Sequence, residues 1–217
     1  MLLNKAFYFM TIECVSVENC HLFEGNPLAE QFRLRYKSLI VRQSWELAVK
    51  DDLEFDQYDN PAAVYFVWRD GHKVAGVSRL YPTTYPYMLK EIFPNLVTRE
   101  PLPTDPTVWE GSRFCVDNDL PPRQRIRICQ ELVLAYLEYG VARGIENIIG
   151  VMLPAYWRNL FVKNGWDLIW LGDAMKDNEG KKIRAARLPV SQDVLNKVKE
   201  TTGLSLPILS YGSKGCS

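Results

Sequence analysis

A long helical pattern over residues 121–144 is followed, after two residues, by the apolar run NIIGVML. Ile128, Leu132, Ala135 and Leu137 supply much of the apolar surface of this helix. Gly144 suits the left-handed residue that often ends a helix. The apolar run predicts a buried strand. A strand of this kind beside a long helix is typical of a sheet that is covered by helices.

The other patterns predict how this sheet is completed. Asn26-Pro27 predicts the start of a helix over about residues 27–43. Two β-rich runs on either side of Asp70-Gly71 predict a hairpin. Shorter helices are expected near residues 88–93, in PAYWRNLFVKNG and over 191–199, and further strands in TVWEGSRFCVD, WDLIWLG and KKIRAARLPV. This order predicts an α/β (α+β) three-layer sandwich, in which a mixed sheet carries helices on both faces.

Length and composition favour one domain over residues 1–217, since 47% of the residues are hydrophobic and can form a core. Residues 1–9 are expected to be an N-terminal extension before the first strand, and residues 207–217 an irregular tail. The 26 basic residues balance 26 acidic ones, so neither nucleic acid nor a membrane is expected as a partner. No apolar run is long enough to span a bilayer.

The cysteines and histidines exclude several classes of protein. The five cysteines form no CxxC pair, which favours reduced thiols and a cytoplasmic location over a disulfide framework or a zinc ribbon. Neither His21 nor His72 has the context of a metal ligand or a catalytic triad. The chain has no GxxxxGK[ST] phosphate loop and no GxGxxG dinucleotide motif.

The acidic segment DDLEFDQYD, residues 51–59, contains five carboxylates. It does not fit a calcium loop, because Gln57 stands where glycine is needed and Ala63 where glutamate is needed, and no metal is expected. Arg35, Arg79 and Arg113 lie in otherwise apolar segments, where an unpaired arginine is costly. We therefore expect a buried or half-buried cluster of these arginines and carboxylates. Such a cluster can be structural or functional, and a solvated acidic loop is the simpler alternative.

Four segments in order, RYKSLIVRQSW, EFDQYD, GVSRLYPTTYPYML and WEGSRFCVD, resemble those of the LuxI-type acyl-homoserine-lactone synthases, the autoinducer synthases of bacterial quorum sensing. The resemblance covers roughly residues 10–190. It implies a fold like that of the GNAT acetyltransferases, with a central cleft in the sheet. It also implies transfer of an acyl group from acyl carrier protein or coenzyme A to the amine of S-adenosylmethionine (SAM). Lactone formation then releases methylthioadenosine, so SAM and the thioester are substrates and no cofactor is implied.

The resemblance also implies roles for individual residues. Glu110 matches the glutamate proposed as the general base. Asp51 and Asp52 match nothing in the pattern and are expected to be a solvated loop. Glu110 and Arg113 are three residues apart and would face opposite sides of a regular strand, so we expect a bulge at Gly111. The residues expected to bind SAM or to form the charged cluster are Arg35, Trp45, Asp56, Asp59, Arg79, Ser112 and Arg113.

The acyl chain is expected to lie against NIIGVML and the helix after it, with Val151, Met152 and Trp157 as pocket walls, although core packing is the default interpretation for such residues. Val151 occupies the position at which some members carry threonine, which is associated with 3-oxo chains. Valine cannot donate that hydrogen bond, so we expect a chain without a 3-oxo group. The basic segments PPRQRIR and GKKIRAAR are candidates for contact with an acidic carrier protein, or are solvated surface.

Two other functions remain possible on the sequence alone. One is a GNAT-like N-acyltransferase that acts on another amine. The other is a non-catalytic regulator that binds SAM or an acyl carrier. Binding of SAM separates the first from a lactone synthase, and the effect of Glu110→Gln on product formation separates the second.

Overall fold

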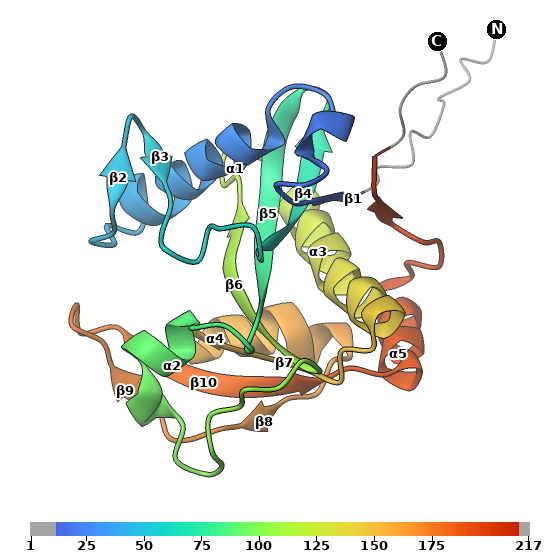
Figure 1. Cartoon of the computed structure of the whole chain (residues 1–217). Helices are drawn as coiled ribbons and strands as arrows, with labels where there is room; N and C mark the ends of the chain where they lie inside the picture. The colour runs from blue at the N-terminus through green and yellow to red at the C-terminus, as the bar shows by residue number, and fades with distance from the viewer. Residues whose placement is uncertain (1–11, 213–217) are drawn as a thin grey trace, which may run out of the picture.

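The computed structural model describes residues 12–212, so the expected extension over residues 1–9 lies outside the described residues. These residues form a mixed sheet in the order β11-β1-β4-β5-β6-β7-β10-β8, with β9 beside β10 (Figure 1). The strands are β1 (Ile12–Val15), β4 (Val64–Asp70), β5 (Lys73–Pro82), β6 (Val108–Val116), β7 (Asn147–Met152), β8 (Ile169–Trp170), β9 (Met175–Lys176), β10 (Lys182–Pro189) and β11 (Leu209–Ser210). A separate small hairpin consists of β2 (Val49–Lys50) and β3 (Leu53–Glu54).

The helices follow the sequence patterns closely. The Asn26 side chain accepts the Ala29 N–H at 3.0 Å, and Gly144 ends the long helix with φ +67°, which confirms both expected helix ends. The predicted helix over 27–43 is α1 followed by a π-helical turn, Tyr36–Val41. The main helices are α1 (Pro27–Arg35), α2 (Met88–Ile92), α3 (Pro122–Arg143), α4 (Pro154–Tyr156) with the π-helical turn Trp157–Phe161, and α5 (Gln192–Thr202).

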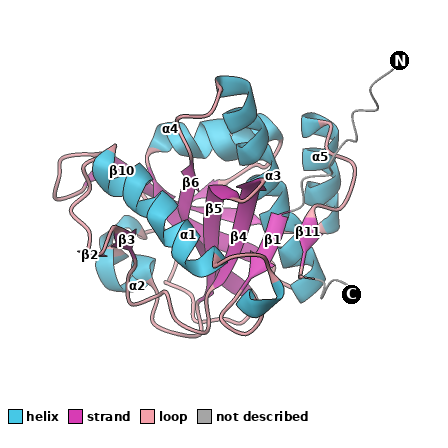
Figure 2. Cartoon of the chain, turned by 90° about the horizontal axis from the view of Figure 1, so that it is seen from above, coloured by secondary structure: helices cyan, strands magenta, loops and turns pink. Residues whose placement is uncertain are grey.

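The sheet separates two hydrophobic cores. On one face Phe66 and Trp68 of β4 pack in the same core as Leu132 of α3. On the other face the alternate residues Tyr65 and Val67 pack with α1 and α2. Figure 2 shows α1 and α3 on opposite sides of the sheet. This arrangement confirms the three-layer sandwich.

The sheet opens between β6 and β7. These strands are parallel and pair only from Val108–Asn147 to Glu110–Ile149, although β6 continues to Val116 and β7 to Met152. Figure 1 shows β6 running upward beside β5, while β7 lies with β10 in the lower part of the molecule. Residues of both strands beyond the last pair line one cavity, so the sheet has the central cleft that the family resemblance implied.

The expectation of an irregular tail over residues 207–217 is wrong for β11. Leu209 and Ser210 pair in parallel with Ile12 and Glu13 of β1 at the edge of the sheet. The segment carries Pro207 and Gly212 on either side, which conceals a two-residue strand from any periodicity argument. Residues 213–217 lie outside the described part of the chain.

Candidate functional site

Asp59 is the centre of a buried cluster of arginines and carboxylates. Its side chain is 1% exposed and accepts two hydrogen bonds from Arg35, at 2.8 and 2.7 Å, and one from Arg79 at 2.7 Å. The Tyr65 hydroxyl donates a further bond at 2.8 Å. Although burial alone would raise it, these contacts hold the pKa of Asp59 well below its usual value. The carboxylate is therefore ionised and paired at neutral pH.

Glu54 is a member of this cluster that the sequence analysis did not assign. It is fully buried on β3, accepts hydrogen bonds from Arg35 Nε at 2.5 Å and from Arg113 Nε at 3.1 Å, and forms an ion pair with Arg113 Nη2 at 2.9 Å. Asp51 and Asp52, by contrast, form the exposed turn between β2 and β3, as expected. No local signal marks this carboxylate as inward-facing, because apolar Leu53 and Phe55 lie on the opposite side of the strand and would ordinarily place Glu54 in solvent.

Asp56 completes the cluster and reaches the cavity. It pairs with Arg79 Nη1 at 2.6 Å and with Arg113 Nη2 at 2.7 Å, and its side chain is 18% exposed. Three arginines thus alternate with three carboxylates, so the cluster is electrically balanced and leaves no surplus negative charge for a cationic substrate. Asp56 and Arg113 line the cavity, whereas Arg35, Asp59 and Arg79 are buried behind it.

The bulge that brings Arg113 into the cluster is at Arg113 itself and not at Gly111. Arg79 pairs with Ser112 and Val77 with Cys115, so residues 113 and 114 together lie opposite one residue of β5. Arg113 adopts φ +53°, which is rare for a residue with a side chain. Gly111 pairs regularly, and a Cβ there would approach the Tyr136 ring to 3.0 Å. The glycine is needed for close packing of α3 on the sheet.

Two neighbours of the bulge, Ser112 and Glu110, differ in their relation to the cavity. Ser112 Oγ accepts a bond from Arg79 Nε at 3.0 Å and lines the cavity. Glu110 is fully buried, and its carboxylate oxygens accept the N–H groups of Met88 at 3.0 Å and Leu89 at 2.6 Å, at the start of α2. Burial raises the pKa of Glu110 to about 7, against the opposing effect of those N–H groups and of the nearby arginines.

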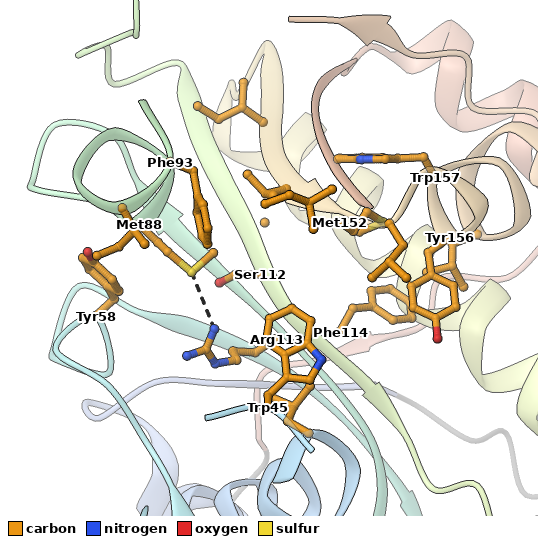
Figure 3. A pocket seen from close by; sticks show the side chains of 18 of the residues that line it. Trp45, Tyr58, Met88, Phe93, Ser112, Arg113, Phe114, Met152, Tyr156 and Trp157 are labelled. Atoms are coloured by element: carbon orange, nitrogen blue, oxygen red, sulfur yellow. Dashed lines mark hydrogen bonds between the residues drawn. The ribbon is translucent and has the colours of Figure 1, made fainter. Parts of the chain in front are cut away.

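The cavity has a volume of about 320 Å³ and joins a polar end to an apolar end. Trp45, Asp56, Ser112 and Arg113 line the polar end. In Figure 3, Trp45 and Arg113 lie together, and Met152, Tyr156 and Trp157 lie on the other side of the cavity with Phe114. Glu110 does not line the cavity. Met88, whose backbone N–H donates to the Glu110 carboxylate, does line it.

The expected acyl-pocket residues all lie on the apolar side. Val151 and Met152 belong to β7 and line the cavity half-buried. Trp157 is 2% exposed, and its indole N–H donates to the Arg184 carbonyl at 2.8 Å, which fixes the ring as a wall. Leu160, Phe161 and Leu188 extend this wall and were not assigned from the sequence.

Among residues 12–212, no group of three His, Cys, Asp or Glu side chains is arranged to hold a metal ion. Within the same range, none of the helices has the length and apolar character needed to cross a bilayer.

Comparisons with known proteins agree with this geometry. The chain is 32% identical to an isovaleryl-homoserine lactone synthase of Bradyrhizobium diazoefficiens, over 89% of this chain and 86% of that protein. It is 31% identical to an acyl-homoserine-lactone synthase of Pseudomonas aeruginosa, over 76% of this chain and 81% of that protein.

Solved structures point the same way. The coenzyme A-dependent acyl-homoserine lactone synthase BjaI, in a complex with SAM and isopentyl-CoA, is 31% identical and superposes with a TM-score of 0.84 over 94% of both chains. The synthase LasI is 26% identical, with a TM-score of 0.75 over 88% of this chain and 93% of that one. The sequence profile of the autoinducer synthases matches residues 19–198. This chain belongs to the autoinducer synthase family.

Proposed function

We propose that this chain is an acyl-homoserine-lactone synthase. It transfers an acyl group from a thioester to the amine of SAM, and the product closes to a lactone as methylthioadenosine leaves. The observation that carries the proposal is the single cavity at the opening of β6 and β7, which joins a charged, aromatic end to an apolar end. The charged, aromatic end suits SAM, which carries charged groups and an adenine ring, and the apolar end suits the acyl chain of the thioester.

At the polar end, Trp45, Asp56, Ser112 and Arg113 bind SAM. An aromatic face attracts a cation and stacks on adenine, and Trp45 offers both interactions. The Asp56 carboxylate accepts a hydrogen bond from the SAM ammonium group, and the Arg113 guanidinium donates to the SAM carboxylate. Arg35, Asp59 and Arg79, with Glu54, hold these groups in place from behind. The balanced cluster supplies rigid positions for hydrogen bonds and not a net attraction.

Glu110 serves as the general base. The SAM amine is an ammonium ion at neutral pH and needs to lose a proton before its nitrogen attacks the thioester carbonyl carbon. A carboxylate whose pKa lies at about 7 is well matched to that proton. Since Glu110 is buried beside the cavity and does not line it, the proton reaches it through a water molecule. The carbon–sulfur bond of the thioester then breaks, and the thiol leaves.

The lactone forms in a second displacement. The SAM carboxylate oxygen attacks the carbon attached to the sulfonium, and the carbon–sulfur bond breaks with its electrons on sulfur. Methylthioadenosine is the leaving group, so its release reports the whole reaction. Neither step uses a cofactor, and SAM and the thioester are both consumed. Both substrates are intracellular metabolites, so we propose that the protein works in the cytoplasm.

The acyl donor is acyl-CoA or acyl carrier protein. BjaI is described as coenzyme A-dependent, which favours acyl-CoA. The two basic segments give limited support for a carrier protein, because several of their arginines are engaged within the chain. Arg127 pairs with Glu131 at 2.5 Å, Arg187 with Glu100 at 3.2 Å, and Arg184 lies over the Trp170 ring at 4.1 Å.

The proposal is tested with purified protein, SAM and a series of acyl-CoAs, by following methylthioadenosine and the lactone by mass spectrometry. We expect both products in equal amounts with at least one acyl-CoA. Acylation of another amine without methylthioadenosine would support a GNAT-like N-acyltransferase instead. SAM binding without turnover of any acyl-CoA or acyl carrier protein would support the non-catalytic regulator.

We expect products without a 3-oxo group, because Val151 lines the cavity with a methyl group where a hydroxyl would be needed. Val151→Thr is nearly isosteric and supplies that hydroxyl. It is expected to raise turnover of a 3-oxoacyl-CoA relative to the unsubstituted acyl-CoA by about fivefold, the worth of one hydrogen bond. The measurement is kcat/KM for the two donors.

Val194→Thr on α5, away from the cavity, is the control for this experiment and should leave the ratio unchanged. An unchanged ratio for Val151→Thr as well would show that Val151 does not face the third carbon of the acyl chain.

A further inference from the structure

The segment that carries Trp45 has little structure of its own. Residues 44–48 belong to no helix or strand. The Ser44 and Trp45 N–H groups donate to the Ile40 and Leu39 carbonyls, both at 3.0 Å, and these bonds tie the segment to the end of the π-helical turn. Ser44 adopts φ +54°, an uncommon conformation for serine. Beyond Trp45, the Leu47 N–H donates to the Trp45 carbonyl at 3.1 Å, a bond within the segment that does not anchor it to the rest of the fold.

The anchoring contacts come from the turn between β9 and β10, more than 130 residues later in the chain. The Glu46 N–H donates to Glu179 Oε1 at 3.0 Å. Lys181 Nζ donates to the Gln43 carbonyl at 2.9 Å and lies 4.9 Å from the centre of the Trp45 ring. Glu179 and Lys181 also pair with each other, so the ammonium is neutralised beside the ring. These contacts hold the segment at Gln43 before Trp45 and at Glu46 after it.

The turn is itself well ordered by its hydrogen bonds. Asp177 Oδ1 accepts the N–H groups of Glu179 at 3.0 Å and Lys181 at 2.8 Å. Gly180 adopts φ +77°, which a residue with a side chain rarely tolerates. The pairs Lys182–Lys176 and Ile183–Met175 join the turn to the sheet. The turn is thus a fixed support and not a second loose loop.

The position of Lys181 relative to the cavity decides its role. Trp45 and Asp177 line the cavity, and Lys181 does not. The lysine therefore contacts the ring from behind the cavity wall, where its side chain remains 29% exposed. Its side chain contacts the Gln43 carbonyl, Glu179 and the Trp45 ring, and these contacts hold the position of the ring.

We propose that Lys181 and Glu179 are positioning residues for SAM, which hold Trp45 in the cavity wall across the opening between the two halves of the sheet. This inference rests on the proposed role of Trp45 in binding SAM. It assigns the turn between β9 and β10 to the SAM side of the cavity. Loss of the support should weaken SAM binding and leave the apolar end, where the acyl chain lies, unaffected.

The test is calorimetric titration of the purified full chain with SAM, together with steady-state kinetics for the best acyl-CoA. Lys181→Met keeps most of the length of the unbranched side chain and removes the charge. We expect a rise in the Kd for SAM of about tenfold, as for a partly desolvated cation–aromatic contact. The KM for acyl-CoA should change less than twofold. Glu179→Ala should raise the Kd for SAM likewise, and Lys181→Arg should restore most of the affinity.

Lys197→Met is a matched control, because Lys197 pairs with Asp167 on the surface of α5 at 2.6 Å and is remote from Trp45. It should bind SAM as the wild type does. The proposal is overturned if Lys181→Met and Glu179→Ala both bind SAM within twofold of the wild type while Trp45→Ala binds it poorly. If Trp45→Ala binds SAM normally, Trp45 is not part of the SAM site, and both this inference and that part of the proposed function fail. Equal losses for SAM and acyl-CoA would indicate general disruption of the cavity and would also overturn it.

Discussion

Glu110→Gln is expected to lower the rate of methylthioadenosine release by about 10²- to 10⁴-fold, the usual contribution of a general base. Glutamine keeps the size of the side chain and one acceptor for the N–H groups at the start of α2, but it cannot take a proton. The measurement is steady-state release of methylthioadenosine at saturating SAM and acyl-CoA. SAM binding should remain within a few fold, because Glu110 does not line the cavity.

The pH dependence of the wild-type enzyme is a second measurement of the same role. With a pKa of about 7, Glu110 is protonated below pH 7, so the rate should fall as the pH decreases through that value. The raised pKa has the opposite sign for stability. An unfolded chain loses this proton near pH 4.5, so the carboxyl group destabilises the folded state increasingly as the pH rises from 4.5 to about 7. The glutamine variant should therefore stay folded at pH 8, which thermal unfolding checks.

Glu146→Gln, at an exposed carboxylate just before β7, is the control and should retain full activity and the same pH profile. A Glu110→Gln variant with nearly wild-type activity, and with the loss of rate below pH 7 still present, would show that another group is the base. Glu110 would then serve only to hold α2.

Asp59→Asn is expected to lower the free energy of unfolding by about 3–5 kcal/mol, the usual result when one partner of a buried ion pair is removed. The amide is close in shape to the carboxylate, but it leaves Arg35 and Arg79 buried with too little negative charge around them. Urea unfolding at pH 7 measures the loss. Asp51→Asn removes the same charge from the exposed turn of β2 and β3, where asparagine tolerates the positive φ of 53°, and should change stability by less than about 0.5 kcal/mol.

The contribution of Asp59 also has a defined pH dependence. Its pKa is lowered in the folded state, so its stabilising effect is complete above the ordinary value of 3.8 and is lost as the pH falls below it. The difference in stability between the wild type and Asp59→Asn should therefore shrink below pH 4. A difference of less than 1 kcal/mol at pH 7 would contradict the central place of Asp59 in the cluster.

Much of the fold was predictable because its signals are local. The Asn26-Pro27 start, the hairpin at Asp70-Gly71 and the glycine after α3 each depend on a few neighbouring residues, and each was confirmed. The charged cluster was predictable for a different reason. A buried arginine needs a carboxylate, and the acidic segment was the natural source.

The errors and omissions have a common physical origin. The bulge was expected at Gly111, the permissive residue, but tertiary packing of Tyr136 requires glycine there, and the strained position is Arg113. In the sequence, Glu54 is indistinguishable from the other acids of a solvated loop. In the structure, β3 places its carboxylate against Arg35 and Arg113. The strand β11 is too short to carry a pattern and exists because β1 lies beside it.

The sequence by itself determined the order of the main helices and strands, the three layers and, through four motifs in a fixed order, the resemblance to the autoinducer synthases. Those features follow from residue types within a few positions of one another. Only the tertiary structure decided which arginine pairs with which carboxylate, that burial raises the pKa of Glu110 to about 7, and that Lys181 lies against Trp45. Such features depend on distance and on exclusion of water between residues far apart in the chain, and local sequence carries neither quantity.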